Sequence, residues 1–203
     1  MKTVLYAWLA ALSLLAASPL AAADAAALAA DCDSCHGPGG VSAHADVPTI
    51  AGQTPEFLMK TLNGFRRWDR PCLKSDWRSG DTSRPRTDMC QIAEGLSDEE
   101  MEALAAHYGA LEFVPAQQAF DEEQAAIGAA LHAEHCDSCH PDGGRSGGRG
   151  PRLAGQWVPY LKTSLKYVPT GEHLVPSTME RRVMDFSAEQ IDALMNFYAS
   201  QQD

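Results

Sequence analysis

Positive charge is scarce in this sequence, and so are long apolar runs. Only 16 Lys and Arg face 27 Asp and Glu, which gives a formal net charge of −11 at pH 7. A chain of this charge is repelled by phosphate backbones, so nucleic acid is excluded as a partner. After residue 23 no segment reaches the roughly 20 apolar residues that span a bilayer, so no stable membrane insertion is expected.

Strand patterns and catalytic arrangements are missing too. No alternation of apolar and polar residues persists over a useful strand length, which favours an all-α fold. No nucleophile is spaced from a base in a way that suggests catalysis, so we predict no catalytic residues in this chain.

The one long apolar run lies at the N-terminus and has the form of an export signal. Lys2 precedes apolar residues 4–20, and three alanines ending at Ala23 form a small-residue cleavage pattern. We predict a signal peptide over residues 1–23, cleaved near Ala23, and a periplasmic mature chain; an uncleaved signal anchor is the alternative. Cleavage would leave 180 residues with a net charge of −12, because Lys2 is the only charged residue removed.

One pentapeptide, Cys-Asp-Ser-Cys-His, occurs twice, at residues 32–36 and 136–140. It is the attachment pattern of c-type haem. Two thiols three positions apart on one helical turn can each add to a vinyl group of one porphyrin, and the following His lies under the ring as the proximal iron ligand. The pattern predicts four attachment cysteines and two proximal ligands, which are Cys32, Cys35, Cys136, Cys139, His36 and His140. A zinc knuckle would need two more ligands near each pair, and a thioredoxin-like dithiol does not need the His.

The whole chain repeats once around these motifs. Residues 48–53 match residues 151–156 at an offset of 103, whereas the final helices match at an offset of 90, so the first half carries 13 extra residues between about residues 66 and 88. We predict two single-haem domains, at residues 24–113 and 122–203, with a linker at 114–121. Capping residues and apolar spacing predict helices over about 24–35, 54–66 and 97–111 in the first half, and over 156–168, from 121 and from 187 in the second.

The repeat also selects a sixth ligand for each iron. Met89 lies eight residues before Ser97, and Met179 lies eight residues before the matching Ser187. Ligation by His and Met fills the coordination sphere, so such an iron passes electrons without binding substrate. His173 is an alternative ligand for the second iron.

Two cysteines, Cys72 and Cys90, have no counterpart in the second half. In an oxidising compartment leftover cysteines usually pair. A bridge would close a loop of about 19 residues, worth around 3 kcal/mol in the chain-entropy account, and would pin the segment that carries Met89. Ligation of iron by a Cys90 thiolate is the alternative.

These motifs resemble those of the dihaem class I cytochromes c. Segments 113–121, 153–161 and 197–202 are similar, more narrowly, to the haem subunit of flavocytochrome c sulfide dehydrogenase. That resemblance implies two class I domains related by a pseudo-two-fold axis, each wrapped around one covalent haem c. It also implies a partner subunit that carries FAD and oxidises sulfide, with a soluble cytochrome c or an oxidase as electron acceptor.

Two other functions stay open. One is a free-standing dihaem shuttle of the c-four type that serves a terminal oxidase, and the other is a dihaem thiosulfate dehydrogenase. The extra loop, which is locally basic and aromatic, departs from the sulfide dehydrogenase subunit. It could be a docking surface or could pack over a haem edge.

Overall fold

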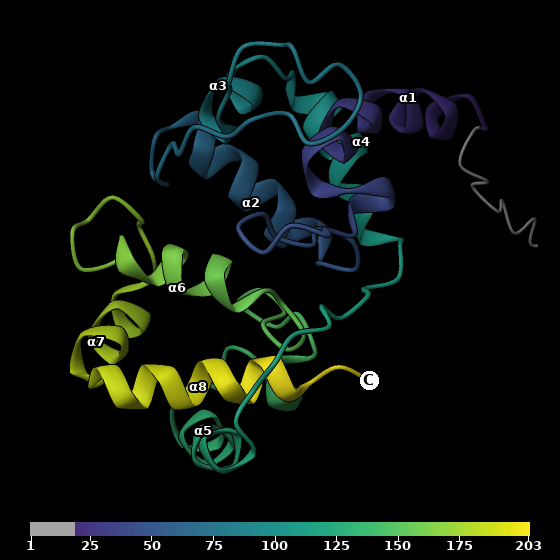
Figure 1. The fold of residues 1–203 in the computed structure, drawn as a ribbon. Coiled ribbons are helices and arrows are strands. Elements are labelled where there is room, and N and C mark those ends of the chain that lie inside the picture. Colours follow the sequence, from purple (N-terminus) through teal and green to yellow (C-terminus); the bar gives the residue numbers. More distant parts are fainter. Residues whose placement is uncertain (1–18) are drawn as a thin grey trace, which may run out of the picture.

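The computed structural model describes residues 19–203, so most of the predicted signal peptide, residues 1–18, lies outside the described residues. The described chain folds into two helical lobes, with α1 to α4 in one and α5 to α8 in the other (Figure 1). Within this range the only β pairing is an isolated antiparallel bridge between Ser75 and Thr87. None of its helices combines the length and apolarity needed to cross a membrane.

The first lobe holds four α-helices and one short 3₁₀ turn. They are α1 (Pro19–His36), η1 (Pro38–Gly40), α2 (Pro55–Arg66), α3 (Met89–Glu94) and α4 (Asp98–Gly109). Thr54 caps α2 by accepting from the Phe57 amide, with Pro55 in the first turn. Ser97 and Glu100 form the predicted capping box of α4. These caps satisfy amides that the helix itself leaves unpaired, which fixes where each helix begins.

The second lobe repeats the order of the first. Its elements are α5 (Glu122–His135), η2 (Asp142–Gly144), α6 (Val158–Lys166), α7 (Ser177–Asp185) and α8 (Ala188–Ser200). Asp121 accepts from the Gln124 amide at the start of α5, and Ser187 and Gln190 form the capping box of α8. The repeat read from the sequence is therefore a repeat of structure.

Two helices were not predicted, and two predicted boundaries were wrong. Helix α3 has only six residues, too few for an apolar period to show. Helix α7 buries none of its residues and has no side-chain cap, so it leaves no signal of either kind. Helix α1 begins at Pro19, five residues before the predicted start, and α6 is shorter than the predicted 156–168.

Each lobe has its own apolar core, built where the last helix packs against the helix that contains or directly precedes the Cys-Asp-Ser-Cys-His motif. In the first lobe the core is Ala29, Leu58, Leu104, Ala105 and Tyr108. In the second it is Leu161, Leu194, Met195 and Tyr198. Tyr108 and Tyr198, which match in the repeat, are thus buried in the two cores.

The lobes meet in a seam with reciprocal hydrogen bonds. The side chain of Gln156 accepts from the amide of Thr49 at 2.9 Å and donates to its carbonyl at 2.9 Å. The side chain of Gln53 does the same to Arg152, at 3.0 and 3.1 Å. Because these residues correspond at the repeat offset of 103, the two halves are related by a pseudo-two-fold axis.

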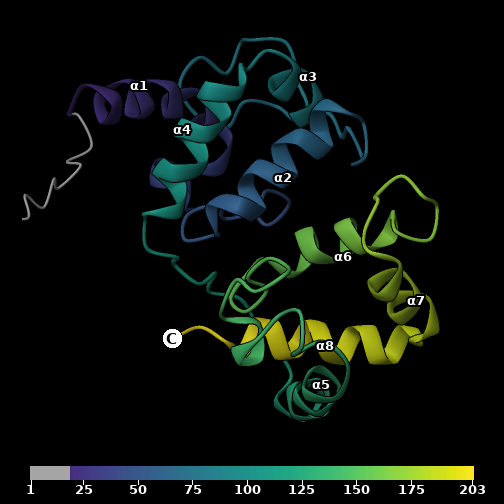
Figure 2. The same ribbon diagram turned by 180° about the vertical axis from the view of Figure 1, so that it is seen from behind.

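The connection between α4 and α5 passes beside this seam (Figure 2). Phe113 and Ala116 are buried, and the Ala116 amide donates to the Gly155 carbonyl at 2.7 Å. The predicted linker is therefore an ordered part of the contact between the lobes.

Candidate haem sites

The two motif histidines have the same surroundings. His36 lies at the end of α1, where its Nδ1 is 2.8 Å from the Pro48 carbonyl oxygen. His140 lies five residues beyond the end of α5, and its Nδ1 is 2.8 Å from the Pro151 carbonyl oxygen. Both rings are buried. A carbonyl can only accept, so Nδ1 carries the proton and Nε2 carries the lone pair.

Burial keeps both imidazoles neutral. It lowers the pKa of His36 and the pKa of His140 below the ordinary value of 6.5. A neutral imidazole with Nδ1 held by an acceptor is the form in which His ligates a metal through Nε2. The arrangement occurs once in each lobe, so the structure offers two equivalent nitrogen donors.

Three of the motif cysteines lie in surroundings that suit uncharged sulfur. Burial raises the pKa of the Cys32 thiol to about 11, and it also raises the pKa of Cys35 and of Cys136. Zinc and redox dithiols need thiolates, which positive or polar surroundings stabilise. The apolar setting therefore favours neutral thioethers over either alternative.

Met89 and Met179 occupy matching places in the two lobes. Met89 is the first residue of α3, and Met179 is the third residue of α7. Each of these short helices directly precedes the capping-box helix of its lobe, and both methionines are half-buried. The correspondence taken from sequence spacing thus has a structural counterpart.

The two alternative iron ligands, Cys90 and His173, lie in different settings. Cys90 is bonded to Cys72, so it has no thiolate to offer iron. His173 is buried and its Nδ1 is 2.9 Å from the Ser164 carbonyl oxygen. Its neighbour Leu174 donates its amide to the Asp69 carbonyl oxygen of the first lobe at 2.8 Å, so His173 lies at the seam.

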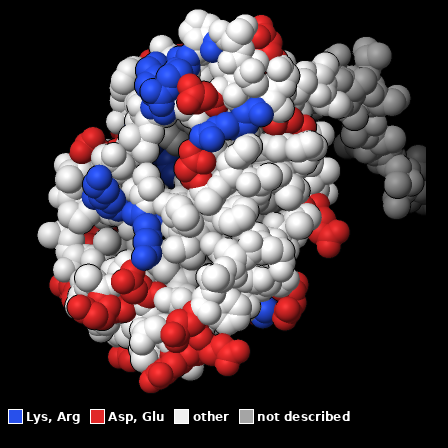
Figure 3. All heavy atoms as spheres, in the orientation of Figure 1, with Lys and Arg blue, Asp and Glu red and all other residues white. Residues whose placement is uncertain are grey.

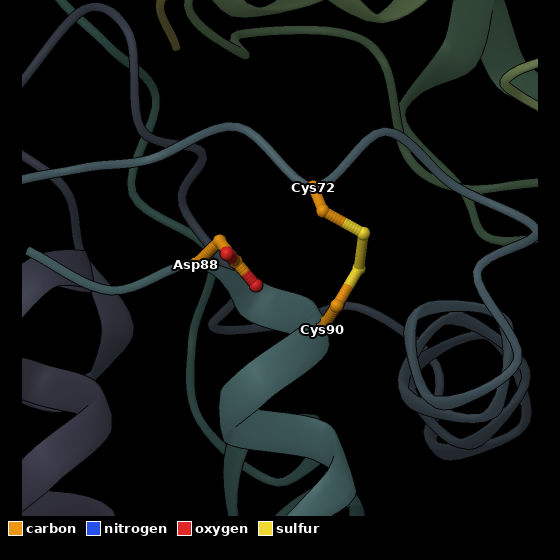
Figure 4. A group of neighbouring side chains, drawn as sticks. All are labelled: Cys72, Asp88 and Cys90. Atoms are coloured by element: carbon orange, nitrogen blue, oxygen red, sulfur yellow. A yellow bond between two sulfur atoms is a disulfide. The ribbon is translucent and has the colours of Figure 1, made fainter.

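The disulfide joins Cys72 and Cys90 with their Cα atoms 5.6 Å apart, as predicted from the unpaired cysteine count. It ties the first turn of α3 to the segment that follows α2, and the Asp88 carboxylate lies beside it (Figure 4). Burial would raise the pKa of Asp88, but hydrogen bonds from Lys74 and from the Gln91 amide overcome this and hold it low. Because the two sulfurs are bonded to each other, neither can ligate a metal, and this cluster is not a metal site.

The extra loop of the first half lies on the first motif. The amides of Arg78 and Ser79 both donate to the Ser34 carbonyl oxygen at 3.0 Å. Arg84 pairs with Asp31 at 2.9 Å and stacks on the ring of Trp77, 3.4 Å from its centroid. The loop therefore packs on the site, which is one of the two roles the sequence left open.

Most of the positively charged side chains of the loop pair with carboxylates of the same lobe. Of its seven cations, six form ion pairs with nearby carboxylates; these six are Arg66, Arg67, Lys74, Arg78, Arg84 and Arg86. On the face drawn in Figure 3, Lys and Arg gather over the upper and left parts, whereas Asp and Glu line the lower edge, over α5 and α8. This face of the molecule is thus polarised, with its positive and negative side chains in different parts.

The residues fit two c-type haems. Each lobe supplies two cysteine sulfurs three residues apart, an imidazole whose Nδ1 is held by a carbonyl and a methionine in the adjoining short helix. In the second lobe the His140 ring lies so close to Gly150 that a Cβ there would be 2.3 Å from it. Backbone packing of this kind holds the ring in one orientation.

Comparison with known proteins agrees with this donor set. Residues 21–108 match the family described as cytochrome c, and residues 123–197 match the family described as cytochrome c oxidase, cbb3-type, subunit III. The chain is 31% identical to cytochrome c4 of Thiocapsa roseopersicina over 147 residues, which cover 67% of this chain and 68% of that one. It is 30% identical to cytochrome c4 of Azotobacter vinelandii over 158 residues, covering 71% and 72%.

This chain belongs to the cytochrome c4 family of dihaem class I cytochromes c. The fold agrees. The structure of reduced recombinant cytochrome c4 from Pseudomonas stutzeri has a TM-score of 0.70 and 23% identity, covering 89% of this chain and 98% of that one. The two lobes are therefore two cytochrome c domains, and domains of this kind imply haem c.

Two further similarities are to proteins named for thiosulfate dehydrogenase. A thiosulfate dehydrogenase electron acceptor of Stutzerimonas stutzeri is 35% identical over 78 residues, 38% of this chain and 31% of that one. Thiosulfate dehydrogenase (TsdBA) of Marichromatium purpuratum has a TM-score of 0.68 and 26% identity, covering 89% of this chain and 40% of that structure. The narrower resemblance to flavocytochrome c sulfide dehydrogenase is not shown by these comparisons.

Several residues that shape the sites were missed from sequence. Pro48 and Pro151 give their carbonyls to the proximal rings, and Tyr108 donates to Asp33 at 2.8 Å inside the first motif. A signal was present, because both the prolines and the tyrosines recur at matching places in the repeat. The contact of the loop with Ser34 had no such signal, since the loop occurs in one half only.

Proposed function

We propose that the mature protein is a periplasmic dihaem electron shuttle of the c4 type, which takes electrons from a donor and delivers them to a terminal oxidase. In each domain two cysteines would attach the haem, with a histidine and a methionine as axial ligands. These residues are Cys32, Cys35, His36 and Met89 in the first domain, and Cys136, Cys139, His140 and Met179 in the second.

The observation that carries the proposal is the duplication of one arrangement. Each lobe orients a buried, neutral imidazole on a proline carbonyl at 2.8 Å, with a candidate thioether ligand in the helix before its last. Two filled coordination spheres suit electron transfer and leave no position for a substrate. The absence of a nucleophile–base arrangement in the sequence is consistent with this.

The chain's own residues would keep each site rigid. When bound, haem c supplies a one-electron iron couple. The carbonyls of Pro48 and Pro151 hold the Nδ1 protons of the proximal rings, so no proton needs to move at these atoms when the charge changes. The reciprocal contacts of Gln53 and Gln156 hold the two domains in one relative position, which fixes the path between the sites.

The redox partner of the protein is a separate question from its family. Relatives named cytochrome c4 match most of both chains, which favours a free-standing shuttle over the FAD-bearing sulfide dehydrogenase partner predicted first. A thiosulfate dehydrogenase role would need an iron with an exchangeable ligand, and Cys90, the one cysteine beside Met89, is held in a disulfide.

Reoxidation of the reduced holoprotein tests the proposal directly. The protein is reduced, freed of reductant and mixed with membranes from its own cells, and its reduced absorption band is followed over time. We expect rapid, cyanide-sensitive reoxidation that changes with ionic strength, because docking to an oxidase by a polarised surface is electrostatic. Absence of reoxidation, together with copurification of a flavoprotein, would favour the sulfide dehydrogenase subunit instead.

A further inference from the structure

The extra loop of the first domain contacts both sides of the first candidate haem site. At one end the Cys72–Cys90 disulfide holds the residue next to Met89, and Cys90 is completely buried. In the middle the loop donates the amides of Arg78 and Ser79 to the carbonyl of Ser34, between the two attachment cysteines. The second domain has no equivalent segment, and its corresponding Ser138 is exposed.

The loop is organised between these two contacts. Ser75 and Thr87 pair with each other through both amides, at 2.7 and 3.1 Å. The Trp77 ring is buried and donates to the Pro85 carbonyl at 2.9 Å. The loop is thus closed at its base, next to the disulfide, by the pairing of Ser75 with Thr87.

The start of α3 is held by the disulfide and by the polar contacts of Asp88. The helix has six residues, and Met89 is its first. Isolated helices of this length are unstable in water, so the position of Met89 depends on what anchors the first turn. Asp88 caps the helix by accepting from the Gln91 amide, and its buried carboxylate also pairs with Lys74, whose side chain is 46% exposed. The disulfide adds a covalent tie one residue from Met89.

We propose that the disulfide-closed loop is a clamp on the first haem site, and that Cys72 and Cys90 are positioning residues that keep the Met89 thioether on the first iron. This inference rests on the proposed axial role of Met89. The second site is independent of the clamp, because Met179 lies in a nine-residue helix with no disulfide near it among the described residues. The two halves, alike in their ligands, therefore differ in how the sixth ligand is held.

The test compares the two sites within one molecule. The reduced holoprotein is labelled at its methionine methyl groups, and proton NMR is used to observe the strongly upfield methyl signal that each iron-bound methionine gives. The wild type is expected to show two such signals, with the Met89 signal assigned by its absence from Met89→Ala. In Cys72→Ser/Cys90→Ser the Met89 signal is expected to disappear or broaden, and the Met179 signal to stay.

A second readout follows the loop itself. Exchange of the Arg78 and Ser79 amides with deuterium is expected to be slow in the wild type and at least tenfold faster in the double serine variant, because the hydrogen bonds to Ser34 open. Arg67→Ala is the matched control, since its ion pair with Asp69 is in the same loop and its side chain is 63% exposed. It is expected to change neither readout.

Reducing the disulfide in the folded wild type separates loss of the disulfide from misfolding of the serine variant. A phosphine and water convert the disulfide to two thiols, the phosphine being oxidised by two electrons, and the thiols are then alkylated while the haems stay covalently attached. Loss of one signal in this sample supports the clamp. Retention of both signals in both samples overturns the clamp, and so does loss of both. Fewer than two signals in the untreated wild type would instead contradict the proposed axial ligands.

Discussion

At the scale of single residues, backbone carbonyls and burial set the chemistry of the histidines. The Pro48 and Pro151 carbonyls fix the tautomers of the proximal rings, and the Ser164 carbonyl does the same for His173 at the seam. His173 is not bound to an acid, and burial together with the nearby charge of Arg70 lowers its pKa to about 4. It is therefore neutral in the folded protein at any ordinary pH.

This makes His173 a source of acid sensitivity. Above pH 6.5 it is neutral in both states and contributes no pH dependence. As the pH falls from 6.5 to 4 the unfolded chain takes up the proton and the folded one does not, so stability is lost, by about 2 kcal/mol after allowance for screening. Urea unfolding of the holoprotein between pH 7.5 and 4.5 should show a smaller loss in His173→Gln than in the wild type. Equal losses would contradict this, because they would mean that the pKa of His173 is the same in the folded and the unfolded chain.

At the scale of elements, the two domains depend on close crossings between the motif helix and the last helix. Gly128 of α5 lies against α8, where an added Cβ would be 2.0 Å from the Ala193 carbonyl oxygen. The helices can approach this closely only because a side chain is absent. The crossing in turn places the second motif at the end of α5.

Replacing Gly128 with Ala tests this crossing by the sign of the effect. Alanine is the better helix former by about 1 kcal/mol, so an uncrowded site would gain stability. We expect a loss of about 2 kcal/mol instead, because the helices must move apart. Gly95→Ala is the control, since its Cβ would be 3.5 Å from the nearest atom, and it should be nearly neutral in the same urea titration. A stabilised Gly128→Ala would contradict the close crossing.

The elements also show what a sequence can and cannot predict. Helices α2, α4 and α8 were predicted because capping residues and apolar periods coincide there. Helix α7 could not be, because it buries no residue and is held by its neighbours alone. The matching places of Met89 and Met179 in the two lobes were predicted from spacing, and the disulfide from an even count of cysteines. The seating of the loop on Ser34 depends on tertiary contacts that no local pattern records.

At the scale of the whole molecule, the domains form one unit through a symmetric seam. Gln156 satisfies both backbone groups of Thr49, which are buried, and Gln53 does the same for Arg152. A buried amide or carbonyl without a partner costs about 1–3 kcal/mol, so each glutamine stabilises the seam strongly for its size. The distance between the two haems would depend on these contacts.

Gln156→Ala should therefore loosen the seam without damaging either core. We expect the Thr49 amide to exchange with deuterium at least tenfold faster, and electron transfer between the two halves to become slower. Gln117→Ala, which removes only an exposed 3.4 Å contact to Gln202, is the matched control and should leave both unchanged. Unaltered exchange at Thr49 in Gln156→Ala would show that the seam is held by other contacts.

The central claim is that two irons are each enclosed between an imidazole and a thioether. Carbon monoxide tests it most directly, because it binds ferrous haem only where the sixth position is open or weakly held. The purified mature protein is weighed by mass spectrometry, reduced and exposed to carbon monoxide while its absorption spectrum is recorded. The account predicts the added mass of two haems and an unchanged spectrum. A mass that lacks one or both haems would contradict the account. So would a shift of the absorption spectrum on adding carbon monoxide, whether it involves one haem or both.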